Sequence, residues 1–272
     1  MNTLVFGHRP ARSSRALPRA AAELGLRVIE LDGEPLPDAL RGSGAHLYCG
    51  LRRADRLAAG LGIALLEAPP RWLADLPREF TGREIVTMPI EQAYLLRRPV
   101  FVKVPNSKDV RAMTYADGSR LPGPDAIDPG TVVLVTEQVR FLAEFRLYVA
   151  DGTVRTGSQY AADGEPALAP LDGHPRRAAV LGFAVDLLAS AAQTLPSATV
   201  VDVGLMRDAT GTERWSVVEA NGAWGSGCYA ADPARALDVI LRSARPLSDL
   251  DAHDRRFVRT GPTDAAPTHP AR

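Results

Sequence analysis

The sequence VVEANGAWGSGCY, residues 217–229, places two polar side chains in an apolar strand and follows them with a glycine-rich loop. Glu219 and Asn221 are two positions apart, so their side chains lie on one face of the predicted strand. Upstream, Asp202 interrupts the apolar run VVDV, and the turn sequence DATG separates the two segments. The pattern predicts a β-hairpin that brings Asp202 beside Glu219 and Asn221.

These three side chains form a candidate metal site. Two carboxylates and an amide oxygen are hard ligands that suit Mg²⁺, which keeps waters and takes its other ligands from substrate phosphates. The alternative is that Asp202 caps a bend and that Glu219 and Asn221 merely end a strand. Carboxylates within valine-rich runs are costly to bury unless they are paired or bind a metal, which favours the metal site. The three glycines of residues 222–227 either let the backbone approach a ligand or form an ordinary turn.

Lysine usage gives a second signal. Of the 32 basic residues only Lys103 and Lys108 are lysines, and both lie in the segment FVKVPNSK. An ammonium is a compact, flexible point charge that suits phosphate oxygens. Chance is the alternative, but two randomly placed lysines would seldom fall this close together beside an apolar strand. We interpret the segment as a phosphate contact.

A third pair of polar residues follows the segment TEQV, which leaves a predicted strand. Glu144 and Arg146 are two positions apart on one face of the next strand. The guanidinium of Arg146 offers a fixed fork to a phosphate or carboxylate. A Glu–Arg pair on a strand is, however, more often a surface ion pair. The residues alone leave both interpretations open.

The composition of the 272-residue chain restricts its partners and its compartment. Its formal net charge is zero, so nothing favours attraction to nucleic acid or to an acidic membrane surface. The two cysteines, Cys49 and Cys228, provide neither a disulfide framework nor the spacing of a zinc site. The N-terminus lacks the apolar region of a signal peptide, and residues 178–192 are too short to span a bilayer. We therefore expect a cytoplasmic protein without nucleic-acid or membrane partners, and the sequence leaves its oligomeric state open.

The first third of the chain alternates predicted strands and helices, a rhythm typical of a parallel α/β layer. The strands are expected at residues 4–6, 27–31, 45–48 and 63–66, and the helices at 13–24 and 51–59. From residue 99 the pattern becomes β-rich, with strands at 100–104, 131–135, 145–149, 154–158, 199–205 and 215–219. Helices are expected at 91–96, at 178–194 (amphipathic) and from Asp232 onward. Asp151-Gly152 predicts a hairpin turn.

The order of FVKVPNSK, EQV-x4-EFR, SQY and VVEANGAWGSGCY resembles the ATP-grasp superfamily, and within it a group of short, mostly uncharacterised proteins. The resemblance covers residues 70–245. It implies an α/β and α+β architecture, in which a parallel α/β layer precedes an ATP-grasp fold of two α+β subdomains with ATP between them. The implied division is 1–97 (N-terminal domain and connector), 98–135 (small lid subdomain), 136–250 (core subdomain) and 251–272 (C-terminal segment, largely a disordered tail).

The resemblance also implies how the nucleotide is held. Lys103 would contact the phosphates and take part in catalysis, and Lys108 would add a second phosphate contact. Glu144 would hold the ribose. Three hinge residues would pair their backbone groups with the adenine edge: Glu137, Gln138 and Val139.

For the reacting end of the nucleotide, the resemblance implies a metal site and an anion contact. The Mg²⁺ ligands would be Asp202, Glu219 and Asn221. Arg146 would contact the γ-phosphate or an acyl phosphate. Many ligases of the superfamily have Pro-Gly after the asparagine, where this chain has Gly222. Many also have an arginine two residues before the first metal ligand, where this chain has Val200, and this difference gives Arg146 a larger role.

The reaction that the resemblance implies is a Mg-ATP-dependent, ADP-forming ligation. A substrate carboxylate would attack the γ-phosphate of ATP to give an acyl phosphate, and an amine or thiol would then displace phosphate. The substrates would be small molecules or peptides that supply the carboxylate and the acceptor. Two alternatives remain: an ATP-dependent phosphotransferase that acts on a hydroxyl, and a nucleotide-binding module without catalysis.

Overall fold

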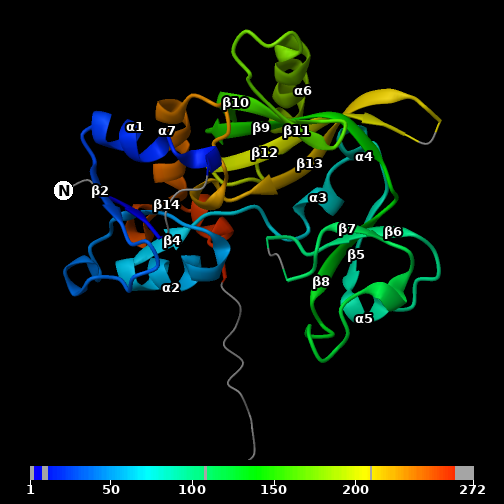
Figure 1. Ribbon diagram of the computed structural model, residues 1–272, viewed down its shortest axis with the longest axis horizontal. Coiled ribbons are helices and arrows are strands. Elements are labelled where there is room, and N and C mark those ends of the chain that lie inside the picture. The colour runs from blue at the N-terminus through cyan, green and yellow to red at the C-terminus, as the bar shows by residue number, and fades with distance from the viewer. Residues whose placement is uncertain (1–2, 8–11, 107–108, 209, 261–272) are drawn as a thin grey trace, which may run out of the picture.

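The computed structural model describes residues 3–7, 12–106, 109–208 and 210–260, and these residues form four β-sheets (Figure 1). An N-terminal layer packs against one end of a five-stranded sheet, and a four-stranded sheet lies beside the other end (Figure 1). Lys108 and nearly all of the predicted C-terminal tail lie outside the described residues.

The N-terminal layer is built on a parallel sheet, as the sequence predicts. Its central strand β1 (Thr3–Phe6) is fully buried and pairs with β2 (Arg27–Glu30) and β3 (His46–Tyr48). Helices α1 (Leu17–Glu23) and α2 (Leu51–Leu61) connect these strands to the following segments. The alternation of strand and helix thus correctly predicts the parallel arrangement of the first three strands.

The fourth predicted strand does not join this sheet. β4 (Ile63–Leu65) pairs antiparallel with β14 (Ala244–Pro246) to form a separate two-stranded sheet. The prediction of a fourth parallel strand is therefore wrong, because local pattern does not specify a strand's partner. Helix α7 (Pro233–Ser243) leads into β14 and packs against α1, so the end of the chain returns to the N-terminal layer. Asp232 caps α7 by accepting two backbone N–H hydrogen bonds, which confirms the predicted start.

The four-stranded sheet is antiparallel and contains the predicted lysine strand. Its order is β5 (Ile85–Pro89), β8 (Val132–Thr136), β6 (Val100–Lys103) and β7 (Met113–Tyr115). The sequence analysis did not predict β5 and β7. The helix expected at residues 91–96 is the short α5 (Ile90–Ala93). Because β5 precedes residue 98, this sheet draws on a segment that was expected to be connector.

The five-stranded sheet is antiparallel and holds the long hairpins. Its order is β11 (Glu165–Pro170), β10 (Thr153–Ala162), β9 (Arg140–Ala150), β12 (Ala198–Arg207) and β13 (Glu213–Asn221). Four of these strands are predicted correctly but are longer than expected, and β11 was not predicted. Asp151 and Gly152 have φ angles of +50° and +66°, as the predicted hairpin turn requires.

One face of this sheet packs against helix α6 (Arg177–Ser190) (Figure 1). The buried core there includes Phe145 and Val203 from the sheet and Leu187 from the helix. The amphipathic interpretation of this helix is wrong, because apolar or small residues such as Gly182 and Val185 occupy much of its exposed side. The opposite face of the sheet is left for polar side chains.

The connector between the N-terminal layer and the small sheet is fixed to the large sheet. It contains α3 (Trp72–Asp75) and α4 (Arg78–Thr81). Arg83, which is buried, donates hydrogen bonds to Ser216 Oγ (2.8 Å) and to the Val217 carbonyl (3.0 Å). Burial lowers the pKa of Arg83 to about 10. Short 3₁₀-helices occur at Arg12–Ser14, Asp38–Leu40, Gly118–Arg120, Ala223–Gly225, Leu247–Asp249 and Asp254–Phe257. Across the described part of the chain, every helix is too short or too polar to cross a membrane.

Candidate active site

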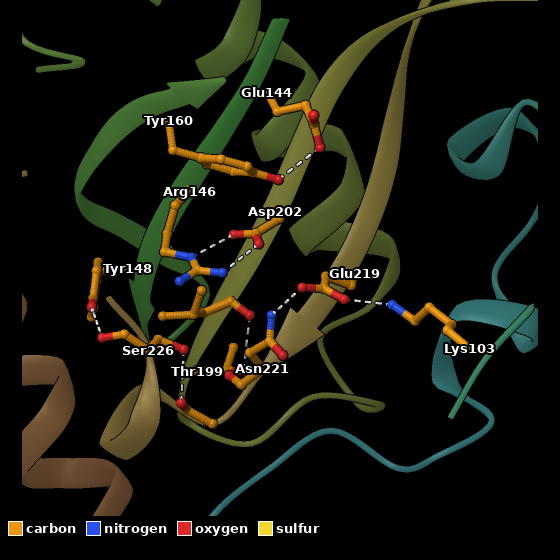
Figure 2. A network of polar contacts seen from close by, with 12 residues as sticks. Lys103, Glu144, Arg146, Tyr148, Tyr160, Thr199, Asp202, Glu219, Asn221 and Ser226 are labelled. Atoms are coloured by element: carbon orange, nitrogen blue, oxygen red, sulfur yellow. Dashed lines mark hydrogen bonds and ion pairs between the residues drawn. The ribbon is translucent and has the colours of Figure 1, made fainter. Parts of the chain in front are cut away.

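A row of charged side chains crosses the polar face of the five-stranded sheet. Arg146 on β9 lies directly opposite Asp202 on β12, and Asp202 lies directly opposite Glu219 on β13. Beyond Glu219, the row ends at Lys103, which β6 of the small sheet supplies (Figure 2). The predicted proximity of Asp202 and Glu219 is confirmed. The charges along the row alternate as one cation, two carboxylates and one cation.

Arg146 and Asp202 form a buried, two-pronged ion pair. Arg146 Nε donates to Asp202 Oδ1 (2.9 Å), and Nη2 donates to Oδ2 (2.7 Å). The side chains are 11% and 1% exposed, respectively. Burial raises the pKa of Asp202, and the charge of Arg146 opposes this rise. The surface Glu–Arg pair that the sequence left open is therefore not what forms, because Arg146 turns to Asp202 on the neighbouring strand.

This pair also accounts for Val200, which stands where many related ligases have arginine. The strand register brings Arg146 from β9 to the carboxylate that an arginine near position 200 would otherwise approach. The site thus contains an arginine although the linear motif lacks one. Strand pairing of distant segments decides this, so the motif alone could not reveal it.

Lys103 and Glu219 connect the two sheets. Lys103 Nζ donates to Glu219 Oε2 at 2.5 Å, and Asn221 Nδ2 donates to Glu219 Oε1 at 2.8 Å. Burial alone would raise the pKa of Glu219, but the Lys103 charge and these two hydrogen bonds hold it at about 2. Glu219 is therefore a carboxylate across the neutral pH range.

The donor set at the centre of the row fits a hard divalent cation. Asp202, Glu219 and Asn221 offer carboxylate and amide oxygens from two adjacent strands, which suits Mg²⁺. Among the residues described, no three His, Cys, Asp or Glu side chains gather in a way that could hold a metal, so the site has two carboxylates only. A cation there would compete with Arg146 and Lys103 for the carboxylate oxygens.

Glu144 lies on the same face, one pleat beyond Arg146. Its Oε2 accepts a hydrogen bond from the hydroxyl of Tyr160 (2.8 Å) (Figure 2). Burial raises the pKa of Glu144, and the nearby charges of Asp202 and Glu219 add to this effect. The role of Glu144 at a ribose stays a prediction. Tyr160 belongs to the SQY segment, where the sequence gave only a faint signal.

The predicted hinge connects the two sheets. Glu137, Gln138 and Val139 form the loop between β8 of the small sheet and β9 of the large sheet. Glu137 Oε1 accepts a hydrogen bond from the backbone N–H of Glu84 (3.3 Å), and Gln138 is exposed. The connection is as expected for a hinge, and the pairing of its backbone with adenine stays a prediction.

The glycine-rich loop after Asn221 packs against the N-terminal layer. A Cβ at Gly225 would lie 3.0 Å from the carbonyl oxygen of Cys49, so glycine is needed for this close approach. Trp224 is buried and donates from Nε1 to the Leu66 carbonyl (3.0 Å). The glycine at position 225 therefore serves contact within the protein, which is neither of the two interpretations drawn from the sequence.

The aromatic residue that contacts Arg146 from this loop was missed by the sequence analysis. Tyr229 stacks on Tyr160 with ring centroids 5.4 Å apart, and its ring lies 5.2 Å from Arg146 Cζ. Its signal in the sequence is only a tyrosine near a glycine-rich loop. Nothing in the linear pattern indicates that its ring returns to β9.

Comparisons with known proteins agree with this architecture. The model of an ATP-grasp domain family, the second family of its clade, matches residues 80–239. Solved structures with a similar fold include D-cycloserine synthetase DcsG (16% identity, 89% of this chain and 99% of that chain, TM-score 0.49). They also include the D-alanine–D-alanine ligase from Bacillus anthracis (12% identity, 89% and 97% coverage, TM-score 0.44).

A third similar structure is the ATP-grasp ligase PsnB in complex with a precursor variant, Mg and ADP (12% identity, 89% and 98% coverage, TM-score 0.46). At these identities none of the three indicates a substrate for this chain. No curated protein matches the sequence. The family match covers more than half of the chain and confirms the predicted fold. The chain belongs to this family of ATP-grasp domains.

Proposed function

We propose that this protein is a Mg-ATP-dependent ligase that joins a carboxylate to an amine or a thiol and releases ADP. The observation that carries the proposal is the charged row, which ends where Lys103 of the small sheet meets Glu219 of the large sheet. In an ATP-grasp fold the nucleotide lies between these two subdomains. Cations and metal-binding carboxylates therefore converge where ATP phosphates would be.

In this proposal the nucleotide is held from both sheets. Lys103, aided by Lys108, binds phosphate oxygens from the small subdomain. The backbone of residues 137–139 pairs with the adenine edge at the hinge. Glu144 uses Oε1 for the ribose, because Tyr160 already occupies its Oε2. Each contact uses a group that faces the boundary between the sheets or lies at the hinge.

Asp202, Glu219 and Asn221 would hold Mg²⁺, which neutralises phosphate charge when bound. Both carboxylates are ion-paired, so their cations need new partners when the metal takes the oxygens. The phosphate oxygens of ATP supply those partners. Arg146 and Lys103 would then stabilise the charge that develops on the transferring phosphoryl group, and no buried charge is left unpaired.

The reaction follows from this placement. A carboxylate oxygen of the substrate attacks the γ-phosphorus, the bond to the bridging oxygen of ADP breaks, and ADP leaves. The amine or thiol then attacks the acyl carbon, phosphate leaves with the bonding electrons, and the acceptor loses a proton. The residues of this chain contribute positioning and charge stabilisation, without a covalent protein intermediate.

Hydroxylamine trapping tests this proposal. The purified protein would be incubated with Mg-ATP, hydroxylamine and a panel of amino acids and short peptides. A ligase gives ADP together with a hydroxamate of the activated carboxylate. ADP with a phosphorylated hydroxyl and no hydroxamate would indicate a phosphotransferase instead. Nucleotide binding without ADP release for any substrate would indicate a binding module.

A further inference from the structure

Tyr229 has a backbone conformation that disfavours a bulky side chain. Its φ angle is +51°, in the left-handed region, where residues with a Cβ are strained. Glycine would adopt this conformation readily, and this loop already contains glycines at positions 222, 225 and 227. A tyrosine at this position therefore needs both a restraint on its backbone and a use for its ring.

The restraint comes from the N-terminal layer. The backbone N–H of Tyr229 donates to the carbonyl of Ser13 at 2.7 Å. Just before it, the Ser226 carbonyl accepts hydrogen bonds from the hydroxyls of Tyr48 (2.9 Å) and Tyr148 (2.8 Å) (Figure 2). Tyr48 is in turn bonded to Ser14 Oγ at 2.6 Å. The loop is thus held between β3 of the N-terminal layer and β9 of the large sheet.

The ring of Tyr229 is used at Arg146. It lies 5.2 Å from Arg146 Cζ, and the ring of Tyr160, on which it stacks, lies 5.7 Å away. The hydroxyl of Tyr160 is anchored on Glu144, so the stacked pair is fixed from both ends. Aromatic faces attract a guanidinium at such distances. The two rings therefore hold Arg146 independently of Asp202.

The hydrogen bonds of Arg146 leave one nitrogen available. Nε and Nη2 are used by Asp202, whereas Nη1 has no hydrogen-bond partner among the described residues. A guanidinium held by aromatic faces and one carboxylate can offer that remaining nitrogen to a further anion.

We propose that Tyr229 is a positioning residue, which holds Arg146 so that its guanidinium contacts the γ-phosphoryl group of the bound nucleotide. The strained backbone of Tyr229 and its bond to Ser13 make the N-terminal layer part of this arrangement. The inference rests on the proposed function only in assuming that Arg146 faces the γ-phosphate. It adds that an aromatic ring supplied by the loop, rather than Asp202 alone, sets where Arg146 stands.

The test compares the affinity for a γ-phosphate with and without the ring. Dissociation constants for Mg-ADP and for Mg²⁺ with a non-hydrolysable ATP analogue would be measured by titration calorimetry. Their ratio reports the contribution of the γ-phosphate. In Tyr229→Leu and Tyr229→Gly the ratio should fall about fivefold to tenfold, the size of a lost cation–π contact. Tyr229→Phe keeps the ring and should keep the wild-type ratio, and Mg-ADP affinity should be unchanged throughout.

Tyr229→Gly also separates this role from a structural one. Glycine relieves the backbone, so this variant should melt no lower than Tyr229→Leu. A ratio that survives in Tyr229→Leu, that falls as far in Tyr229→Phe, or that is already one in wild type would overturn the inference. Hydroxamate formation by the wild type is measured separately. A wild type that forms hydroxamate while the ratio is insensitive to Tyr229 refutes only the positioning role, and the reverse result refutes only the ligase.

Discussion

The two ion pairs of the site differ in what holds them together. Arg146 and Asp202 stand opposite each other on neighbouring strands of one sheet, and both side chains are buried. Lys103 and Glu219 come from different sheets, and the Glu219 side chain is 33% exposed. Strand register fixes the first pair, whereas the second depends on how the small sheet is placed. The site thus combines a fixed platform with a contact that bridges two subdomains.

The strongest test of the platform is Asp202→Asn. This change keeps the shape of the side chain but leaves the buried guanidinium of Arg146 without a counter-charge. The free energy of unfolding should fall by about 3–5 kcal/mol, as for other buried ion pairs that lose one partner. Urea denaturation measures the loss, and Mg-dependent ADP release should also be abolished.

The matched control removes both charges. Arg146→Met combined with Asp202→Leu leaves no buried charge, so it should recover much of the lost stability without restoring ADP release. A single Asp202→Asn variant as stable as wild type would contradict the interpretation of this pair as a fixed platform.

Glu219→Gln should separate activity from stability in the bridging pair. The flexible stem of Lys103 lets its ammonium reach water, so the free energy of unfolding should change by only about 1 kcal/mol. ADP release should nevertheless fall by at least about a hundredfold, because a predicted metal ligand and its charge are lost. Near-normal ADP release in this variant would remove Glu219 from the metal site.

Lys103→Arg tests the shape of the bridging cation. The Lys103 side chain is only 15% exposed between the sheets, and the larger planar guanidinium does not suit a position built for a compact ammonium. ATP turnover should drop by about tenfold to a hundredfold, as expected for a misplaced contact, while the thermal midpoint stays near that of wild type. Arg98→Lys, at an exposed position close to the same strand, is the matched control and should have no effect. An unaltered turnover in Lys103→Arg would argue against a phosphate contact there.

The contrast between the pairs also marks what the sequence could predict. The hairpin that joins Asp202 to Glu219 was predictable, because its two strands are consecutive and the turn between them is recognisable. The pairing of Arg146 with Asp202 was not, because β9 and β12 are neighbours only in the finished sheet. The Lys103–Glu219 contact depends on the relative placement of two sheets, about which periodicity carries no information.

Some elements lack the pattern on which prediction relies. β11, with the sequence EPALAP, contains two prolines, which normally argue against a strand, and they are tolerated because β11 is an edge strand. β4 has a strand pattern, but its partner β14 is a three-residue segment that no pattern distinguishes. The conformation of Tyr229 is likewise set by contacts with the N-terminal layer rather than by its neighbours in sequence.

The smallest expected effect is at the ribose, on the platform side of the site. Glu144→Ala should weaken binding of a non-hydrolysable ATP analogue by about 1–3 kcal/mol, the value of lost charge-assisted hydrogen bonds. Because Glu144 also anchors Tyr160, Tyr160→Phe is needed as a control: it removes that bond, keeps the ring and should leave the affinity unchanged. Gln138→Ala should also have little effect, since the hinge is expected to use its backbone. Calorimetric affinities that are equal in wild type and Glu144→Ala would place the ribose elsewhere and confine the platform's role to the phosphate end of the nucleotide.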